Sequence, residues 1–494
     1  TATVAQWQAA LRAVTWTDFA VTPNTATRTV GFTVNDGTKN SAVATRQITV
    51  TATDQTPIVT TSGGSVAFTA GDNTVSTPVV IDSAITISDS DNTTLASATV
   101  AITGNFHAAE DVLAFTNTSG ATFGNIVASY NSGTGVLTLT SSGATATVSQ
   151  WQSALRAVTW ADGATTPNTA TRVISITVND GIKNSAVVTR AIAMSIPVPS
   201  VTGITAASDT GSSASDGITR NTQPTFIGTA QAGSTVTVYV DAVSVGTTTA
   251  DGSGVWSFTP PGVLSEGSHM VSAMATLGGV NSVISASASV VIDTTAPAVP
   301  TGIALTAATD TGASASDGVT SNPQPSLTGM ATAGSLVSVY IDGSPVGTTT
   351  ADGTGAWQYN LAGLLPDGPH TVRATATDTA GNVSTASTPW TFTVDTTAPA
   401  VPTGIALTAA TDTGASASDG VTANNQPSLT GAATAGSLVT VYIDGTAVGT
   451  TTADGTGAWQ YNIAGPLQDG AHMVRTTATD TAGNVSAAKI GRAH

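Results

Sequence analysis

The sequence predicts an all-β protein, built from tandem β-sandwich domains that follow one another as an elongated string. Three observations indicate this class. The 494 residues include 50 glycines, only 9% are charged, and every acidic residue except Glu110 and Glu266 is an aspartate, which is a composition typical of turns. Short runs of Val, Ile and Leu recur between those turns, and long stretches of the chain repeat.

Two repeat lengths divide the chain. Trp7 matches Trp151 at an offset of 144 residues, whereas Trp357 matches Trp459 at an offset of 102. Residues 293–320 and 395–422 are identical. We therefore expect the C-terminal part of a truncated long repeat, one complete long repeat, three short repeats of which the last is truncated, and a non-native tail, over residues 1–53, 54–197, 198–292, 293–394, 395–488 and 489–494. The tail, KIGRAH, fits none of the repeats and resembles read-through of a sequencing adapter.

The short repeats have the pattern of an antiparallel sandwich. Val337, Val339 and Ile341 alternate with polar residues, as they do in a half-buried strand. The dipeptides Asp342–Gly343 and Asp352–Gly353 are turn signals on either side of the next strand. About seven such strands in ~100 residues fit an immunoglobulin-like sandwich that lacks the usual cysteine pair.

The long repeat adds one short helix to its strands. Val148, Trp151, Leu155 and Val158 follow helical spacing, and Thr147 with Gln150 can form a capping box before them. The flanking segments ATVAITG and GVLTLTS read as strands. We expect one such helix in each long repeat.

Charge and composition exclude several classes of protein. The net charge is −17 and the chain has three lysines, Lys39, Lys183 and Lys489, which argues against nucleic-acid binding. There is no cysteine, so disulfides and zinc–thiolate sites are excluded. No apolar run reaches the ~18–20 residues of a membrane-spanning helix.

Nothing in the sequence predicts catalysis. His269, His370 and His472 occupy one position of the short repeat, which indicates a turn rather than an active site. No nucleophile elbow, HExxH motif or P-loop is present, so we predict that the chain is not an enzyme. Trp256, Trp357 and Trp459 could stack on sugars, but a core position is favoured.

The aspartates are the best functional signal, because calcium prefers six to eight oxygen ligands. They recur in the linker VDTTAP, the loop ATDTGASASDG, the turn TATDTAGN and, in the long repeat, TATDQTP and ISDSDN. The candidate ligands are Asp293, Asp395, Asp209, Asp216, Asp310, Asp317, Asp412, Asp419, Asp378, Asp480, Asp54, Asp89 and Asp91. Turn formation alone is the competing explanation.

We expect one Ca²⁺ ion at the junction between the last two short repeats. Asp395 from the linker, with Asp412 and Asp419 from the following loop and Asp378 from the preceding repeat, would supply its oxygens. Without the ion these carboxylates would repel one another, because few basic residues lie near them in the sequence.

These segments resemble a known class of protein. TAGSLVTVYIDGTAVGTTTADGTGAWQYN, HTVRATATDTAGNVS and VDTTAPAVP resemble the bacterial immunoglobulin-like repeats of giant adhesins, which are type I-secreted, biofilm-associated proteins of the RTX type. ISDSDNTTLASATVAITGNF and VNDG resemble the cadherin-like repeats of similar surface proteins. Two departures put calcium in doubt locally: Leu277 stands where the neighbouring repeats have Asp378 and Asp480, and Val198 stands where the earlier junction has Asp54.

The resemblance implies an extracellular stalk on the bacterial cell surface, stiffened by calcium, which projects a distal binding domain for adhesion and biofilm formation. Its partners would be the neighbouring repeats, with cell-surface glycans or abiotic surfaces bound by domains outside this sequence. Two alternatives stay open. The repeats could bind glycans themselves through residues such as Trp357, or they could be the accessory region of a large surface enzyme.

Overall fold

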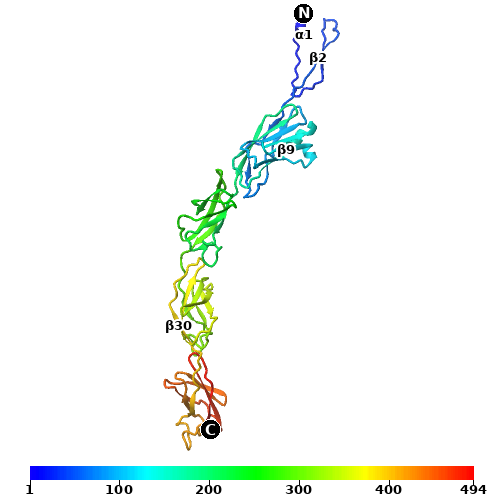
Figure 1. Ribbon diagram of the computed structural model, residues 1–494. Helices are drawn as coiled ribbons and strands as arrows, with labels where there is room; N and C mark the ends of the chain where they lie inside the picture. The colour runs from blue at the N-terminus through cyan, green and yellow to red at the C-terminus, as the bar shows by residue number, and fades with distance from the viewer. Residues whose placement is uncertain (494) are drawn as a thin grey trace. The chain divides into compact units, whose positions relative to one another are not determined.

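The computed structural model describes residues 1–493, with the backbone alone for residues 491–493, and consists almost entirely of strands (Figure 1). Its contacts divide the chain into two compact units, each described by itself. One contains Thr1–Ile204, Thr225–Gly262 and His269–Val290, and the other contains Thr205–Pro224, Val263–Ser268 and Val291–His494. The predicted all-β class with tandem sandwich domains is confirmed.

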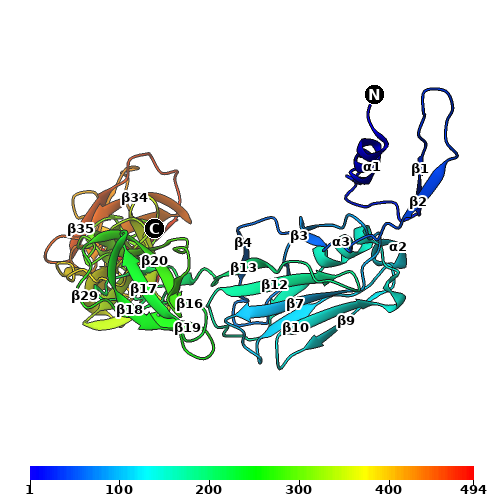
Figure 2. The same ribbon diagram turned by 90° about the horizontal axis from the view of Figure 1, so that it is seen from above.

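The first 53 residues have no buried side chain. They form α1 (Val4–Arg12) and a two-stranded sheet of β1 (Arg28–Phe32) and β2 (Ala44–Ile48), which stand apart from the neighbouring sandwich in Figure 2. Trp7 is 55% exposed, whereas its counterpart Trp151 is fully buried.

The long repeat forms three sheets. The large sheet has the order β4-β13-β12-β7-β10-β9, and the smaller sheets have the orders β5-β11-β8 and β3-β6. The neighbouring strands of these sheets are antiparallel except β13 and β4, which are parallel. The strands are β3 (Ile58–Thr60), β4 (Ser65–Thr69), β5 (Val79–Val80), β6 (Thr86–Ser88), β7 (Ser97–Gly104), β8 (Asp111–Ala114), β9 (Ile126–Asn131), β10 (Val136–Ser141), β11 (Thr159–Asp162), β12 (Arg172–Asn179) and β13 (Val188–Ser195).

The predicted helix of the long repeat is α3 (Val148–Arg156). Thr147 caps it, and Gln150 completes the expected capping box. The Trp151 ring is buried in the core, and its Nε1 donates to the Leu95 carbonyl at 2.9 Å. The structure adds a one-turn helix, α2 (Gly120–Phe123), and a short 3₁₀ turn at Ser142–Ala144.

The second short repeat is a two-layer sandwich. A three-stranded sheet, β23-β25-β28, faces a five-stranded sheet of order β24-β30-β29-β26-β27. Its strands are β23 (Thr301–Leu305), β24 (Val319–Thr320), β25 (Ser326–Met330), β26 (Leu336–Ile341), β27 (Ser344–Thr350), β28 (Ala356–Asn360), β29 (Gly368–Thr377) and β30 (Trp390–Val394). Asp342 and Gly343 both have positive φ, 51° and 82°, which is the conformation of a two-residue hairpin turn.

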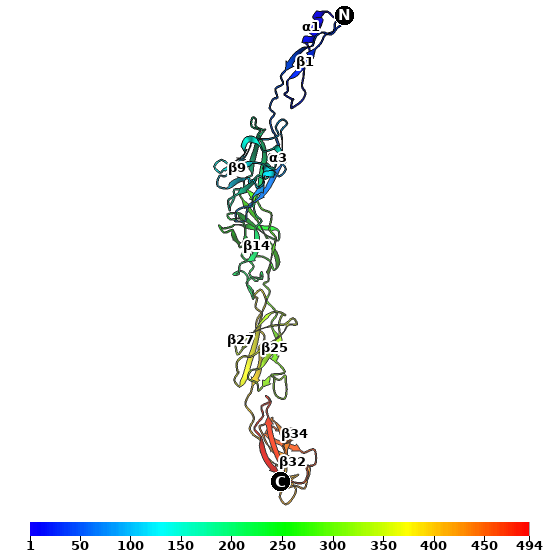
Figure 3. The same ribbon diagram turned by 90° about the vertical axis from the view of Figure 1, so that its right-hand side faces the viewer.

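The third short repeat repeats this plan (Figure 3). Its sheets have the orders β31-β32-β35 and β34-β33-β36-β37. The strands are β31 (Thr403–Leu407), β32 (Ser428–Ala432), β33 (Leu438–Ile443), β34 (Thr446–Thr452), β35 (Ala458–Asn462), β36 (His472–Thr479) and β37 (Lys489–Ala493). The strand β37 is formed by residues of the C-terminal tail and pairs with β36.

The first short repeat contributes strands to both compact units. In one, β14-β16-β19 form a sheet, and β17 pairs with both β18 and β20. In the other, β15 pairs with the end of β22 in parallel. The strands are β14 (Ser200–Ile204), β15 (Ile218–Thr219), β16 (Phe226–Thr229), β17 (Thr235–Val240), β18 (Val243–Thr249), β19 (Val255–Phe258), β20 (Gly267–Leu277), β21 (Val280–Asn281) and β22 (Ala288–Ile292).

Candidate metal sites and repeat junctions

Three predicted ligands come together at the N-terminal end of the long repeat. Asp89 Oδ1 accepts from the backbone N–H groups of Asp91 and Asn92, and Asn92 Nδ2 reaches Asp54 Oδ1 at 3.4 Å. Asp91 Oδ2 accepts from the N–H of Gln55 at 2.9 Å. These contacts tie the segment before β3 to the ISDSDN loop, so residues about 35 positions apart in the sequence share one site.

The electrostatics of this group favour a cation. Asp54 Oδ2 and Asp89 Oδ2 are buried without a hydrogen-bond partner, and Asp54 Oδ2 forms an ion pair with Lys183 Nζ at 3.9 Å. Burial raises the pKa of the Asp89 carboxyl, and the nearby charge of Asp91 raises it further. A cation beside Asp89 would offset this penalty. Oxygen donors of this kind suit Ca²⁺, although the three carboxylates are not grouped closely enough to hold an ion by themselves.

Each short repeat carries a buried aspartate that closes a loop. We call residues 205–217, 306–318 and 408–420 the threonine–glycine loops. Asp209, Asp310 and Asp412 each accept from a glycine N–H eight residues later, at 3.0, 3.1 and 3.2 Å, and each keeps a second oxygen that is buried without a partner. Burial raises the pKa of Asp310, with a further contribution from the charge of Asp317.

The second aspartate of each threonine–glycine loop accepts a hydrogen bond from the backbone. Asp216, Asp317 and Asp419 are exposed, and each accepts from the N–H two residues later. This is the ordinary turn role of aspartate.

The TATDTAGN segments fix the linkers. Asp378 and Asp480 accept through both carboxylate oxygens from the backbone and the amide of Asn382 and Asn484. The same two asparagine amides donate to the carbonyl oxygens of Asp293 and Asp395, both at 2.7 Å. We refer to Asp378–Asn382 and Asp480–Asn484 as the DTAGN turns.

The predicted grouping of aspartates around Asp395 is wrong. At the junction of the second and third short repeats, the DTAGN turn of the third repeat meets the threonine–glycine loop of the second, which contains Asp310 and Asp317. Asp412 and Asp419 do not share this junction, because β31 carries the chain from Asp395 to the other end of the sandwich. Asp378 lies instead at the junction of the first and second short repeats, where its turn contacts the loop that contains Asp209.

The junction aspartates do not assemble into a ready metal centre. Among residues 1–490, whose side chains the structure describes, no three side chains of His, Asp or Glu are grouped so that they could hold an ion. At Leu277, where an aspartate is missing, the backbone carbonyl instead accepts from Thr169 Oγ1 of the long repeat at 3.1 Å.

One charged network was missed from the sequence. Arg172 is fully buried, and its Nε lies 2.9 and 3.0 Å from the two carboxylate oxygens of Asp111. Glu110 and Asp162 lie within 3.4 and 3.7 Å of the same guanidinium. The sequence did contain a sign of this network, because Arg172 and Asp162 recur as Arg28 and Asp18, 144 residues earlier. The side chains of Arg28 and Asp18 lie 4.0 Å apart.

The repeated tryptophans belong to the cores. Trp256, Trp357 and Trp459 are 1%, 3% and 2% exposed, which confirms the core position and leaves no face for a sugar. The repeated histidines lie in the strands β20, β29 and β36, so the prediction that they belong to a turn is wrong, although each one contacts a turn. The Nδ1 atoms of His269, His370 and His472 lie 2.7 Å from an aspartate of the β17–β18 turn or its equivalents.

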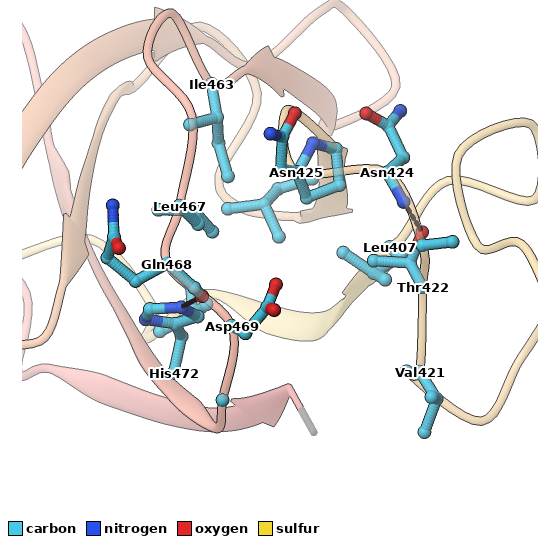
Figure 4. A pocket seen from close by; sticks show the side chains of 16 residues that line it. Leu407, Val421, Thr422, Asn424, Asn425, Ile463, Leu467, Gln468, Asp469 and His472 are labelled. Atoms are coloured by element: carbon cyan, nitrogen blue, oxygen red, sulfur yellow. Dashed lines mark hydrogen bonds between the residues drawn. The ribbon is translucent and has the colours of Figure 1, made fainter.

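One cavity reflects a packing difference between repeats. It occupies about 380 Å³ in the third short repeat, between Leu407, Ile463, Leu467 and His472 (Figure 4). In the second repeat, Phe392 and Trp390 lie at the corresponding place, with the rings of His370 and Phe392 5.6 Å apart. The strand β37 is also shifted, since His472 pairs with Ala493, the equivalent of Thr391, whereas His370 pairs with Phe392.

Comparison with known sequences gives the family. Residues 195–294, 296–396 and 398–492 match the family described as bacterial Ig-like domain, so the match covers more than half of the chain. The chain belongs to the bacterial Ig-like domain family. None of the helices in the described part of this bacterial Ig-like chain has the length and hydrophobicity that crossing a bilayer requires.

The individual relatives are much longer proteins. Halomucin of Haloquadratum walsbyi is 36% identical over 142 residues, which are 28% of this chain and 2% of halomucin. Exoglucanase B of Cellulomonas fimi is 32% identical over 289 residues, which are 55% of this chain and 24% of the enzyme. The chain thus spans a quarter or less of either relative.

Two solved structures are similar over most of the chain. A tetra-tandem repeat in the extending region of a large adhesion protein is 20% identical and covers 87% of this chain and 100% of its own, with a TM-score of 0.21. The BSP domain of a biofilm-associated protein is 12% identical and covers 93% of this chain and 99% of its own, with a TM-score of 0.15. At these scores no functional argument rests on either structure.

Proposed function

We propose that this chain is a stalk segment of a large extracellular adhesin on a bacterial surface. Its role is mechanical: the repeats hold a distal binding domain away from the cell. Three consecutive bacterial Ig-like domains support this role. The long repeat and the second and third short repeats each have a core of their own, and short linkers join consecutive repeats.

The linker residues Asp293 and Asp395 are hydrogen-bonded to the repeats on both sides, and this observation is the main support for the proposal. The N–H of Asp293 donates to Thr219 of the preceding repeat, and its carbonyl accepts from Asn382 of the following repeat. Asp395 repeats both contacts with Thr320 and Asn484. A linker bonded on both sides limits bending, which is the property that a stalk needs.

The location of the protein tests this function. An antibody raised against residues 54–488 should label intact cells of the source organism without permeabilisation, and a binding domain should be encoded in the same gene. Labelling that appears only after lysis would contradict a surface stalk. We propose export of the type I (RTX) kind and a contribution to biofilm formation, which deletion of the gene would test separately.

We further propose that Ca²⁺ stiffens the stalk, beginning at the N-terminal end of the long repeat. Asp54, Asp89 and Asp91 would hold the ion, and backbone carbonyls and water would complete its oxygen shell. Two buried oxygens that accept no hydrogen bond, Asp54 Oδ2 and Asp89 Oδ2, support this site, and the ion would compete with Lys183 for Asp54. The unpaired oxygens of Asp209, Asp310 and Asp412 make the threonine–glycine loops weaker candidates, each with one such oxygen.

Calorimetric titration of the full chain tests calcium binding. Asp89→Asn should remove one class of Ca²⁺ site, because it takes one carboxylate charge from the proposed site. Asp352→Asn is the matched control, since Asp352 is exposed and bonded within its own turn to Thr354 and Ala356. Equal binding by Asp89→Asn and the wild type would eliminate this site.

An accessory region of a surface enzyme is the second candidate. The similarity to Exoglucanase B over 55% of this chain favours it. The flanking sequence of the gene distinguishes the two functions, because an enzyme requires a catalytic domain in the same polypeptide. A glycan-binding role for the repeats has lost its main support, because Trp357 is buried.

A further inference from the structure

The threonine–glycine loops and the DTAGN turns contact one another directly across two junctions. Thr210 Oγ1 donates to the Ala380 carbonyl, and Thr311 Oγ1 donates to the Ala482 carbonyl, both at 2.7 Å. The donor and the acceptor occupy the same repeat positions in both cases. The contact therefore belongs to the repeat pattern and not to one pair of domains.

Glycine permits the close approach of the two backbones. A Cβ atom added at Gly312 would lie 2.0 Å from the Thr481 carbonyl oxygen, and one added at Gly211 would lie 1.9 Å from that of Thr379. On the other side, a Cβ at Gly483 would lie 2.9 Å from the Gly312 nitrogen. Any side chain at these positions would force the loop and the turn apart.

The third threonine–glycine loop has the same sequence but no turn against it in the described residues. Thr413 Oγ1 bonds only within its own repeat, to Thr422 and Ala423, and Gly414 is exposed. The φ angle of Gly414 is 147°, whereas Gly211 and Gly312 have 112° and 108°. The two docked loops thus share a backbone conformation that the third copy does not have.

The junction after the long repeat uses a different pairing. The turn of the first short repeat has the sequence LGGVN from Leu277 to Asn281, and Thr169 Oγ1 donates to the carbonyls of Leu277 and Gly278. These two acceptor carbonyls lie earlier in the turn than the acceptor carbonyls of Ala380 and Ala482 do in theirs. The long repeat therefore contacts an LGGVN turn, whereas the first and second short repeats contact DTAGN turns.

We propose that the threonine–glycine loop is a docking surface specific for a DTAGN turn of another bacterial Ig-like repeat. The threonine hydroxyl of the loop donates a hydrogen bond to the alanine carbonyl of the turn. The loop glycine and the turn glycine approach so closely that the turn must have glycine at its fourth position. The loop at Thr413–Gly414 is a further copy of this surface, and its occupant is a repeat that carries such a turn. The inference deepens the proposed stalk function, because docking sets the order and orientation of repeats without a metal ion.

Spin-label distance measurements on the full chain test this inference. The chain has no cysteine, so Thr348→Cys and Thr450→Cys, both at exposed positions, would label the second and third short repeats specifically. With EDTA present, the wild-type distance distribution should be narrow. Thr311→Val combined with Gly312→Ala should broaden it at least twofold.

The identical loop of the third repeat supplies the matched control. Thr413→Val with Gly414→Ala makes the same chemical change where no turn is docked, so it should leave the distribution as narrow as in the wild type. Equal widths for the wild type and the Thr311/Gly312 variant would overturn the docking surface. A broad wild-type distribution in EDTA that narrows with Ca²⁺ would also overturn it, and would favour the calcium mechanism instead. Surface location of the protein is unaffected by either result.

Discussion

At the scale of single residues, the histidines connect each short repeat to its own hairpin turn. His370 Nδ1 lies 2.7 Å from Asp342 Oδ2, and its Nε2 lies 2.9 Å from the Pro366 carbonyl. Burial lowers the pKa of His370, but the bonds to Asp342 and Pro366 outweigh it and raise the pKa above its usual 6.5. The pKa of Asp342 is lowered; burial opposes the shift, and the bonds to Thr371 and His370 exceed it.

These shifts predict how the contact depends on pH. The histidine contribution to stability is fully present below pH 6.5 and is lost as the pH rises through the raised pKa of His370. The aspartate contribution is fully present above pH 3.8 and is lost as the pH falls through the lowered pKa of Asp342. The pair is therefore strongest between those two values.

Comparison with His370→Gln measures this dependence. Unfolding is followed by the fluorescence of Trp357, with the other tryptophans replaced by phenylalanine in both chains. The unfolding midpoints of the wild type and the variant should differ less and less as the pH rises from 6 to 9. A difference that stays constant over this range would mean that His370 acts through packing alone.

At the scale of elements, a buried arginine joins β8, β11 and β12 of the long repeat. Arg172 on β12 lies between Asp111 on β8 and Asp162 on β11, and all three side chains are fully buried. Its guanidinium also lies 5.8 Å from the Trp160 ring. Burial raises the pKa of both aspartates, which the opposite charge of Arg172 partly offsets. Three strands from two sheets thus depend on one cation.

Arg172→Ala should destabilise the long repeat by about 3–5 kcal/mol, because it leaves buried carboxylates without their counterion. Urea unfolding, followed by the buried Trp151 and Trp160, measures this loss. Arg28→Ala is the control, since Arg28 occupies the equivalent position but is 31% exposed and only 4.0 Å from Asp18. It should change stability by less than about 1 kcal/mol. Similar effects of the two changes would refute the role of burial.

At the scale of the whole molecule, the cores are separate. Apolar clusters form within the long repeat, the second short repeat and the third short repeat, and each is built from residues of that repeat alone. Independent cores joined by short linkers predict a string of domains and not one shared globule.

Small-angle scattering tests the predicted elongation. A compact body of this length would have a radius of gyration of about 23 Å. We expect a value well above that, and one that changes little between Ca²⁺ and EDTA if loop docking holds the repeats. A radius near the compact value would exclude a stalk. A large increase on chelation would assign the stiffness to calcium.

The sequence by itself determined the strands, turns and repeats of this protein. Alternation such as Val337, Val339 and Ile341 reports a half-buried strand, and Thr147 with Gln150 reports a helix start, because these signals depend on neighbours along the chain. The Asp54, Asp89 and Asp91 group was also foreseeable, since the long repeat carries its acidic segments at one end.

Only the tertiary structure decided which distant residues meet. One strand, β31, separates Asp395 from Asp412, and a single strand carries the chain from one end of a sandwich to the other. The sequence does not state at which end a loop lies, so the prediction placed Asp412 at the wrong junction and overlooked Thr311 and Asn484. Arg172 was overlooked for the same reason, because its three carboxylates come from strands that are neighbours in space and distant along the chain.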